Sequence, residues 1–267
     1  MSFPVLAARS LYHWSRRMVH PLVDSFLPVN YTPHEFRAQK ARLDPDNARS
    51  SPKRNPHTTG RITEIGAVLG VDPSRVMDML DEARNIRMAE GTSDPAAELA
   101  SPMCCEDRYA MYVVTRAIQP QVVVETGVAH GSSSTYVLAG LEAVGRGSLI
   151  SIELSDDPNV GGMIPKRLRP RWELKRGQSL DVLPNVLSEH GPIGMFVHDS
   201  WHRCRHVTRE LELAWPHLSP GGVMCVHDIL ANNAFPRFLR RHASEIAGSI
   251  ASVNFGLIRK RGAAGPG

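Results

Sequence analysis

Two short motifs pair an acid with a histidine, and they are the residues of this sequence best suited to chemistry. Asp199 and His202 lie in the motif Asp-Ser-Trp-His, and His227 and Asp228 are adjacent; each motif follows an apolar run typical of a buried strand. Parallel strands of an open α/β sheet bring their carboxyl ends to the edge where ligands bind. A hard cation such as Mg²⁺ prefers oxygen ligands. Candidate metal ligands are therefore Asp199 and Asp228, with His227 and Asn232 beside them.

A glycine-containing turn earlier in the chain is the candidate ligand loop. Val122–Val124 are β-branched, as in a strand buried on both faces. Gly127 and Gly131 then allow a tight turn into a helix that Ser132 can cap, and backbone amides at such a helix start can face a ligand. The spacing is Glu-x-Gly-x-x-x-Gly rather than Gly-x-Gly-x-x-Gly, which disfavours a Rossmann-type oxidoreductase.

This loop, starting at Glu125, resembles motif I of the class I methyltransferases, which bind S-adenosylmethionine (SAM). Glu153 ends the next expected strand, where an acid in doubly wound sheets accepts hydrogen bonds from ribose hydroxyls; the alternative is an ordinary surface glutamate. The resemblance places Gln178 and Ser179 beside the adenine ring, although they could equally form a turn and an N-cap. The expected cofactor-binding residues are Glu125, Gly127, Gly131, Ser132, Ser133, Glu153, Gln178, Ser179 and Asp199.

Alternating strands and helices are needed to bring these residues together. The apolar patterns predict strands at 122–124, 148–154, 172–175, 193–198 and 223–226, with one last strand or a short hairpin at 250–259. Helices are expected at 106–118, 133–144 and 207–218. Two further helices are expected, one that includes residues 183 and 186 and one that includes residues 238, 239 and 246. The predicted fold class is α/β, a mostly parallel sheet of six or seven strands flanked by helices, with an N-terminal helical extension.

The second half of the chain resembles a particular methyltransferase family. Asp-Ser-x-His, a helix, Pro-Gly-Gly at 220–222 and a strand ending in His227-Asp228 are similar to methyltransferase domain family 24. The resemblance covers roughly residues 101 to 260 and implies a Rossmann-like class I methyltransferase fold. This chain departs from the family at Ser200, where glycine is commoner, and at Cys204 and Arg205, where an aromatic residue is expected shortly after the histidine.

The resemblance implies SAM-dependent methyl transfer to a hydroxyl of a small-molecule acceptor such as a sugar, a glycolipid or a natural product. A hydroxyl proton is held tightly at neutral pH, so a general base or a divalent cation must activate the oxygen. His202 and Asp199 are the expected catalytic residues, with His202 as the base, and Mg²⁺ is expected between Asp199 and Asp228. Alternatively, His202 caps its helix and the two acids hold backbone amides. A catalytically silent SAM-fold interaction protein is the alternative function; the intact Asp199, His202 and Asp228 argue against it.

Three segments are expected along the chain: a basic extension and linker at 1–60, a small helical segment at 61–100 and the SAM-binding methyltransferase domain at 101–263. The helical segment has the outline of a helix-turn-helix. Its exposed face carries Asp78, Asp81 and Glu82, which would repel phosphates, so we expect no nucleic-acid partner.

Composition limits the remaining possibilities. The net charge of +4 and the pI near 9.0 come mostly from the ends of the chain, where solvated tails explain them. The four cysteines have no Cys-x-x-Cys spacing, and neither a signal peptide nor an apolar run of membrane length is seen, which fits a reduced cytoplasmic compartment. The first 29 residues could lie on a membrane surface, but we favour packing on the domain or on a second subunit, and expect a homo-oligomer.

Overall fold

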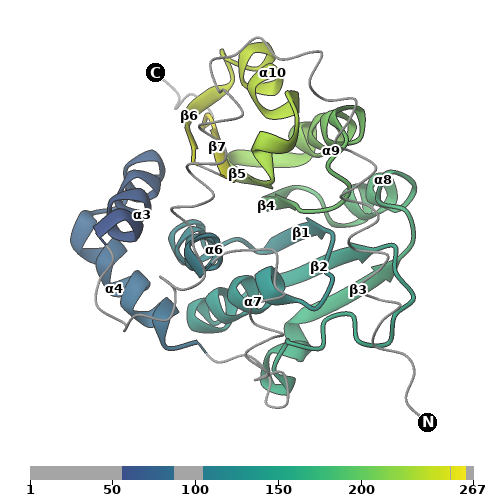
Figure 1. Cartoon of the computed structure of the whole chain (residues 1–267), viewed down its shortest axis with the longest axis horizontal. Helices are drawn as coiled ribbons and strands as arrows, with labels where there is room; N and C mark the ends of the chain where they lie inside the picture. Colours follow the sequence, from purple (N-terminus) through teal and green to yellow (C-terminus); the bar gives the residue numbers. More distant parts are fainter. Residues whose placement is uncertain (1–55, 87–104, 253, 263–267) are drawn as a thin grey trace. The chain divides into compact units, whose positions relative to one another are not determined.

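Short runs of apolar and β-branched residues form the strands of a single sheet. The computed structural model describes residues 56–86, 105–252 and 254–262 (Figure 1). Within these residues the sheet has seven strands in the order β3-β2-β1-β4-β5-β7-β6, and β7 runs antiparallel to β5 and β6 while the other neighbouring pairs are parallel. The strands are β1 Val122–Thr126, β2 Ser148–Glu153, β3 Trp172–Arg176, β4 Ile193–His198, β5 Leu218–His227, β6 Ile246–Ala251 and β7 Phe255–Lys260. The expected α/β class with a mostly parallel sheet is confirmed.

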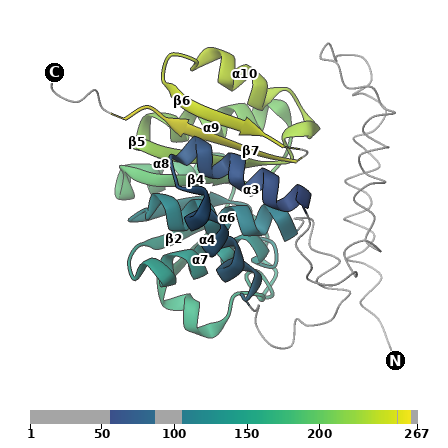
Figure 2. The same cartoon turned by 90° about the vertical axis from the view of Figure 1, so that its left-hand side faces the viewer.

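Helices cover both faces of this sheet. One layer contains α3 (Pro56–Leu69), α4 (Pro73–Arg84), α6 (Cys105–Ile118) and α7 (Ser132–Val144). The opposite layer contains α8 (Ser179–His190), α9 (Cys204–His217) and α10 (Ala234–Arg241). Two short 3₁₀ helices, η1 (Lys166–Arg171) and η2 (Ile229–Ala231), lie in connections. Figure 2 shows α3 beside α6 and the β6–β7 hairpin.

The two-residue period of the strands divides the hydrophobic core between these layers. Val123, Met195 and Cys225 are buried against the α6 and α7 side, whereas their neighbours Val124 and Phe196 are buried against the α8 and α9 side. Because both faces are covered, the central strands are apolar throughout. The carboxyl ends of β1, β2, β4 and β5 therefore emerge together at one edge, where the candidate site lies.

The C-terminal elements differ from the expected ones. The helix predicted to run through Phe238, Leu239 and Ile246 ends at Arg241, and Ile246 begins β6 instead. From Ile246 to Ala251, half-buried and exposed residues alternate strictly, which is the strand period rather than the helical one. β6 and β7 pair as an antiparallel hairpin, so the hairpin alternative for this region is confirmed.

The N-terminal predictions are only partly covered by the described residues. α3 begins at Pro56, before the expected boundary at residue 60, and α3 and α4 share one hydrophobic core with the sheet. Residues 1–55, including the possible membrane-surface segment, and residues 87–104 lie outside the described part. The division into three segments stays a prediction. Among the helices that could be searched, none is long and apolar enough to cross a membrane.

Candidate functional site

The glycine turn after β1 is held by the acid at the end of β2. Oε2 of Glu153 accepts hydrogen bonds from the backbone N–H groups of Val128 and Ala129 at 2.8 and 3.0 Å, and Oε1 accepts one from Ser155 at 2.8 Å. Burial alone would raise the pKa of Glu153, but these backbone donors hold it below its ordinary value. Glu153 is therefore ionised at neutral pH and fixes the loop to β2.

Close backbone packing explains the first glycine of this turn. Gly127 has φ +84°, and a Cβ placed on it would lie 2.2 Å from the backbone oxygen of Asp199. The close approach that requires glycine is thus to the end of β4, not only to a ligand. The backbone N–H of Asp199 also donates to the carbonyl of Thr126 at 2.8 Å, so the ends of β1 and β4 are locked together.

Glu125 points into the protein interior. It is fully buried, and its carboxyl oxygens accept hydrogen bonds from the hydroxyls of Ser133, Ser134 and Ser151 at 2.6–2.7 Å. Burial outweighs these bonds and raises the pKa of Glu125 to about 7. Glu125 and Ser133 therefore join β1, β2 and α7 beneath the glycine turn. Their predicted contact with a cofactor is not tested by this arrangement.

Ser132, in contrast, has a hydroxyl group without a protein partner. α7 begins at Ser132, and its N-cap is Gly131 rather than the expected serine, so no side chain caps the helix. The Oγ atom of Ser132 is buried and makes no hydrogen bond among the described residues. Because buried polar groups are normally hydrogen-bonded, this hydroxyl, beside the free amides of a helix start, fits a polar ligand.

Three carboxylates surround His227 at the end of β5. Its Nδ1 lies 2.9 Å from Oδ1 of Asp199 and 3.8 Å from Oδ1 of Asp228, and its Nε2 lies 3.5 Å from Oδ2 of Asp107 in α6. The Nδ1–Asp199 contact is an ion pair without the alignment of a hydrogen bond. Burial alone would lower the pKa of His227, but Asp199 and Asp107 outweigh it and raise this pKa well above the ordinary value.

His202 forms a dyad with Asp228. Its Nε2 lies 3.0 Å from Oδ2 of Asp228, while its Nδ1 is buried and has no hydrogen-bond partner among the described residues. Asn232 donates from Nδ2 to the carbonyl of His202 at 2.9 Å, which ties the loop after β4 to the loop after β5. Burial lowers the pKa of His202, although Asp228 opposes this. A neutral His202 with Nε2–H held by Asp228 keeps a lone pair on Nδ1.

A buried carboxylate of α9 connects the strand ends below this dyad. Glu210 accepts hydrogen bonds from the hydroxyls of Thr126 and Ser200 at 2.7 and 2.8 Å, and contacts His198 and His206 at 2.6 and 2.8 Å. The ring of His206 also reaches the hydroxyl of Ser179 at 3.0 Å, so this predicted cofactor residue belongs to the same network. Gln178, the residue before it, is exposed at the N-cap of α8.

Sequence reasoning missed part of this site. Asp107, Asn254 and Glu210 were not singled out, although each contacts a member of the network. Glu210 did carry a signal, because it stands on the apolar face of α9 among Val207, Leu211 and Ala214. Asp107 and Asn254 lie far from the motifs in the chain and carried no comparable signal.

Of the four predicted metal ligands, Asp199 and Asp228 are the two that remain available to a cation at this edge. Both ring nitrogens of His227 face protein groups, Asp199 at Nδ1 and Asp107 with Asn254 at Nε2. Both ends of the Asn232 amide are also used, by the carbonyl of His202 and the N–H of Ala234. Within the described ranges, no group of three or more His, Cys, Asp or Glu side chains is arranged to hold a metal ion. A cation would therefore depend on Asp199 and Asp228 with water completing its shell, which is a weak site for Mg²⁺.

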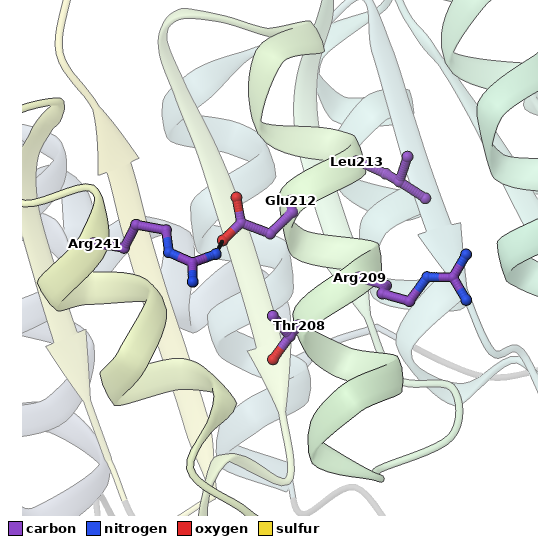
Figure 3. Close-up of a pocket in the computed structure, with 5 residues that line it drawn as sticks. All are labelled: Thr208, Arg209, Glu212, Leu213 and Arg241. Carbon is purple, nitrogen blue, oxygen red and sulfur yellow. Dashed lines mark hydrogen bonds and ion pairs between the residues drawn. The ribbon is translucent and has the colours of Figure 1, made fainter.

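A pocket of about 390 Å³ on the outer side of α9 and α10 is separate from these groups. It is lined by Thr208, Arg209, Glu212, Leu213 and Arg241, with an ion pair of 2.7 Å between Glu212 and Arg241 (Figure 3). No strand end or loop of the candidate site contributes to it. We place the chemistry at the sheet edge, where the polar side chains converge.

Comparisons with known proteins bear on the family and the fold of this chain. Residues 124–229, less than half of the chain, match the family described as a methyltransferase domain, family 24. No curated protein sequence gives a significant match.

Solved structures share the fold at low sequence identity. The O-methyltransferase TomG from Streptomyces achromogenes, involved in tomaymycin synthesis and in complex with SAM, is 19% identical, with a TM-score of 0.53 over 69% of this chain and 90% of its own. An O-methyltransferase from Bacillus cereus in complex with S-adenosylhomocysteine (SAH) is 17% identical, with a TM-score of 0.52 over 69% and 91%. The SAH-bound Podospora anserina methyltransferase PaMTH1 is 13% identical, with a TM-score of 0.52 over 89% and 99%. The match to MycE, a methyltransferase of the mycinamycin pathway, spans only 48% of that protein. The fold is thus the Rossmann-like class I methyltransferase fold.

Proposed function

We propose that this chain, a class I methyltransferase in fold with a methyltransferase domain at residues 124–229, transfers a methyl group from SAM to a hydroxyl of a small molecule. The observation that carries the proposal is the meeting of two parts at one sheet edge. The glycine turn follows β1 and leads to Ser132, whose hydroxyl has no hydrogen-bond partner among the described residues. The His202–Asp228 dyad lies on the loops after β4, which neighbours β1 in the sheet, and β5, which neighbours β4. Binding and proton removal are the two tasks that methyl transfer to a hydroxyl demands.

The cofactor would be held by the residues around the glycine turn. SAM supplies an electrophilic methyl group on a sulfonium centre. Oε2 of Glu153 accepts from two backbone amides, but Oε1 accepts from one and keeps a lone pair that can accept from a ribose hydroxyl. Ser132 and the first-turn amides of α7 offer donors to an anionic part of the cofactor. Glu125 and Ser133 would act by fixing the loop, and Gly127, Gly131, Gln178, Ser179 and Asp199 complete the proposed set.

His202 is proposed as the general base. Asp228 accepts from Nε2 and so leaves the lone pair on Nδ1, a buried atom without a protein partner among the described residues, and the lowered pKa of His202 keeps this nitrogen unprotonated at neutral pH. Asp199 acts indirectly, since its carboxylate pairs with His227 and its backbone is locked to β1. The acceptor classes expected are sugars, glycolipids and natural products, because the family includes such enzymes.

A test of cofactor binding uses two neighbouring serines. Calorimetry should show saturable one-to-one binding of SAH to the full chain. Ser132→Ala should weaken it about threefold to tenfold, the contribution of one hydrogen bond, without lowering the melting temperature, because this hydroxyl bonds to nothing in the protein. The matched control Ser134→Ala removes a bond to Glu125 and should lower stability more than affinity. Absence of SAH binding to the folded parent would contradict the proposed function.

A divalent cation held by Asp199 and Asp228 is a second, separable proposal. When bound, such a cation would lower the pKa of an acceptor hydroxyl. Titration of the SAH-loaded protein with Mn²⁺, followed by electron paramagnetic resonance, should detect a site that Asp228→Asn removes. The control Asp156→Asn changes an exposed acid beyond the end of β2 and should leave it intact. Binding that is equal in all three proteins would exclude this cation site.

The remaining expectations stay predictions. A homo-oligomer, the absence of a nucleic-acid partner and a cytoplasmic location all require measurement. A catalytically silent SAM-fold protein stays the alternative, and detectable methyl transfer to any hydroxyl acceptor would exclude it.

A further inference from the structure

We infer that the methyl acceptor is a flat, apolar molecule that carries an anionic group, bound by Trp201 and Arg203 beside His202. This inference rests on the proposed function and names the substrate class of the same site. It comes from two features at the sheet edge, an exposed apolar surface and a set of arginines without carboxylate partners in the described parts of the chain.

The first feature is apolar surface at the sheet edge. Among the described residues, the large hydrophobic side chains left exposed are Leu154 at 66%, Trp201 at 60% and Leu230 at 38%. Each lies just beyond the carboxyl end of a parallel strand, β2, β4 or β5. Singly exposed apolar residues are ordinary, so it is the shared position of these three at the ends of parallel strands, where open α/β sheets bind ligands, that points to a binding surface.

Trp201 and Leu230 lie on the two loops that carry the dyad. Trp201 directly precedes His202, and Leu230 follows Asp228 by two residues. These loops are joined by the His202–Asp228 contact at 3.0 Å and by the Asn232 bond to the carbonyl of His202 at 2.9 Å. The indole of Trp201 packs edge-on against His206, with ring centres 5.6 Å apart, and is otherwise largely exposed. An apolar molecule on its open surface would therefore be held by the same loop that carries the proposed base.

The second feature is a group of arginines without carboxylate partners. The guanidinium of Arg203 lies 4.9 Å from the ring centre of Trp201, and Nη1 of Arg237 lies 4.0 Å from Sγ of Cys204 at the start of α9. Arg205, between them in the chain, is exposed. None of the three has a carboxylate within 4.0 Å in the described parts of the chain, whereas Asp199 and Asp228 are paired with His227 and His202.

These two features together select the charge and shape of the acceptor. An arginine stacked on an aromatic ring keeps its N–H edge free for a carboxylate or phosphate. A flat ring on the exposed indole can gain stacking energy. A neutral sugar could stack a C–H face on the indole but would leave Arg203 without a partner, so an anion with an aromatic or similarly planar body fits best.

A matched pair of probes tests the inference. The SAH-loaded full chain is titrated with 3,4-dihydroxybenzoate and with its methyl ester, which has the same ring and hydroxyls but no charge. The acid should bind about fivefold more tightly than the ester, because one charge-assisted contact is made at a partly exposed site. Arg203→Gln should abolish this preference, and Trp201→Ala should weaken both probes.

Arg209→Gln is the control variant. It removes an exposed arginine six residues further along, on the outer side of α9, as Figure 3 shows, and should keep the preference for the acid. Equal binding of the two probes, loss of preference with Arg209→Gln, or binding of neither probe to the SAH-loaded protein would overturn the inference. SAH binding is measured first and alone. If SAH does not bind, the proposed function is wrong. If SAH binds but the preference for the acid does not depend on Arg203, only the inference about the acceptor is wrong.

Discussion

At the scale of residues, the His202–Asp228 dyad makes a sharp kinetic prediction. His202→Ala should lower the single-turnover methyl-transfer rate by about 10²–10⁴ while leaving the affinity for SAH unchanged, because a general base acts in the transition state and not in cofactor binding. Asp228→Asn keeps an acceptor for the Nε2–H group and should lose less. A rate for His202→Ala within threefold of the parent would make His202 a structural residue only.

The residues of this site were predictable where the motifs were short and ended strands. Asp199, His202, His227 and Asp228 do come together, since parallel strands deliver their ends to one edge. Their partners were not predictable. Asp107 meets His227 across 120 positions of the chain, and such a pair depends on how α6 packs on the sheet, which no local spacing encodes.

At the scale of elements, Glu210 joins α9 to the ends of β1 and β4 and so sets how these elements meet. Its pKa is lowered: burial opposes ionisation, but hydrogen bonds from His198 and His206 outweigh it. A carboxylate whose pKa is lower in the folded than in the unfolded protein stabilises the fold at pH values above its unfolded pKa, here near 4.5. This stabilisation is lost as the pH falls toward the pKa of the folded state. Glu210→Gln should therefore lower the free energy of unfolding by about 3 kcal/mol at pH 7, and the difference should shrink in acid.

Urea unfolding at pH 7 and at the most acidic pH at which the parent still folds measures this difference, because most of the contribution is still present just below the unfolded pKa. The control is Glu212→Gln, two residues along the same helix, where the carboxylate pairs with Arg241 and His242 near the surface and should contribute less than about 1 kcal/mol. Equal losses for the two variants, or a loss for Glu210→Gln that is constant with pH, would contradict the proposed role of this network.

Element boundaries were predictable where apolar periodicity and glycines coincide. β4 was expected at 193–198 and has these bounds, and Gly145 ends α7 as expected. Ile246 was placed in a helix because it continues an apolar spacing from Phe238 and Leu239. The pairing of β6 with β7 decides otherwise, and this long-range contact is invisible in a local window.

At the scale of the whole molecule, the helical segment before residue 87 belongs to the same core as the sheet. Ile62, Ile65, Val76 and Leu80 are fully buried in one cluster with Val223 and Leu257 of the sheet. The sequence showed two amphipathic helices but not the surface that they cover, because periodicity identifies an apolar face and not its partner. A shared core implies that the segment and the sheet unfold as one cooperative unit.

Leu80→Ala tests this cooperativity. Removing a fully buried leucine in α4 should lower the free energy of unfolding by about 2–5 kcal/mol. If the core is shared, native-state hydrogen exchange should show the same drop in protection for the slowest amides of α4 and of β4, although β4 is far from the substitution in the chain. Leu154→Ala, at an exposed position, should change neither. A drop confined to α3 and α4, with β4 protected as in the parent, would show instead that the helical segment opens separately and that the sheet with its site is stable without it.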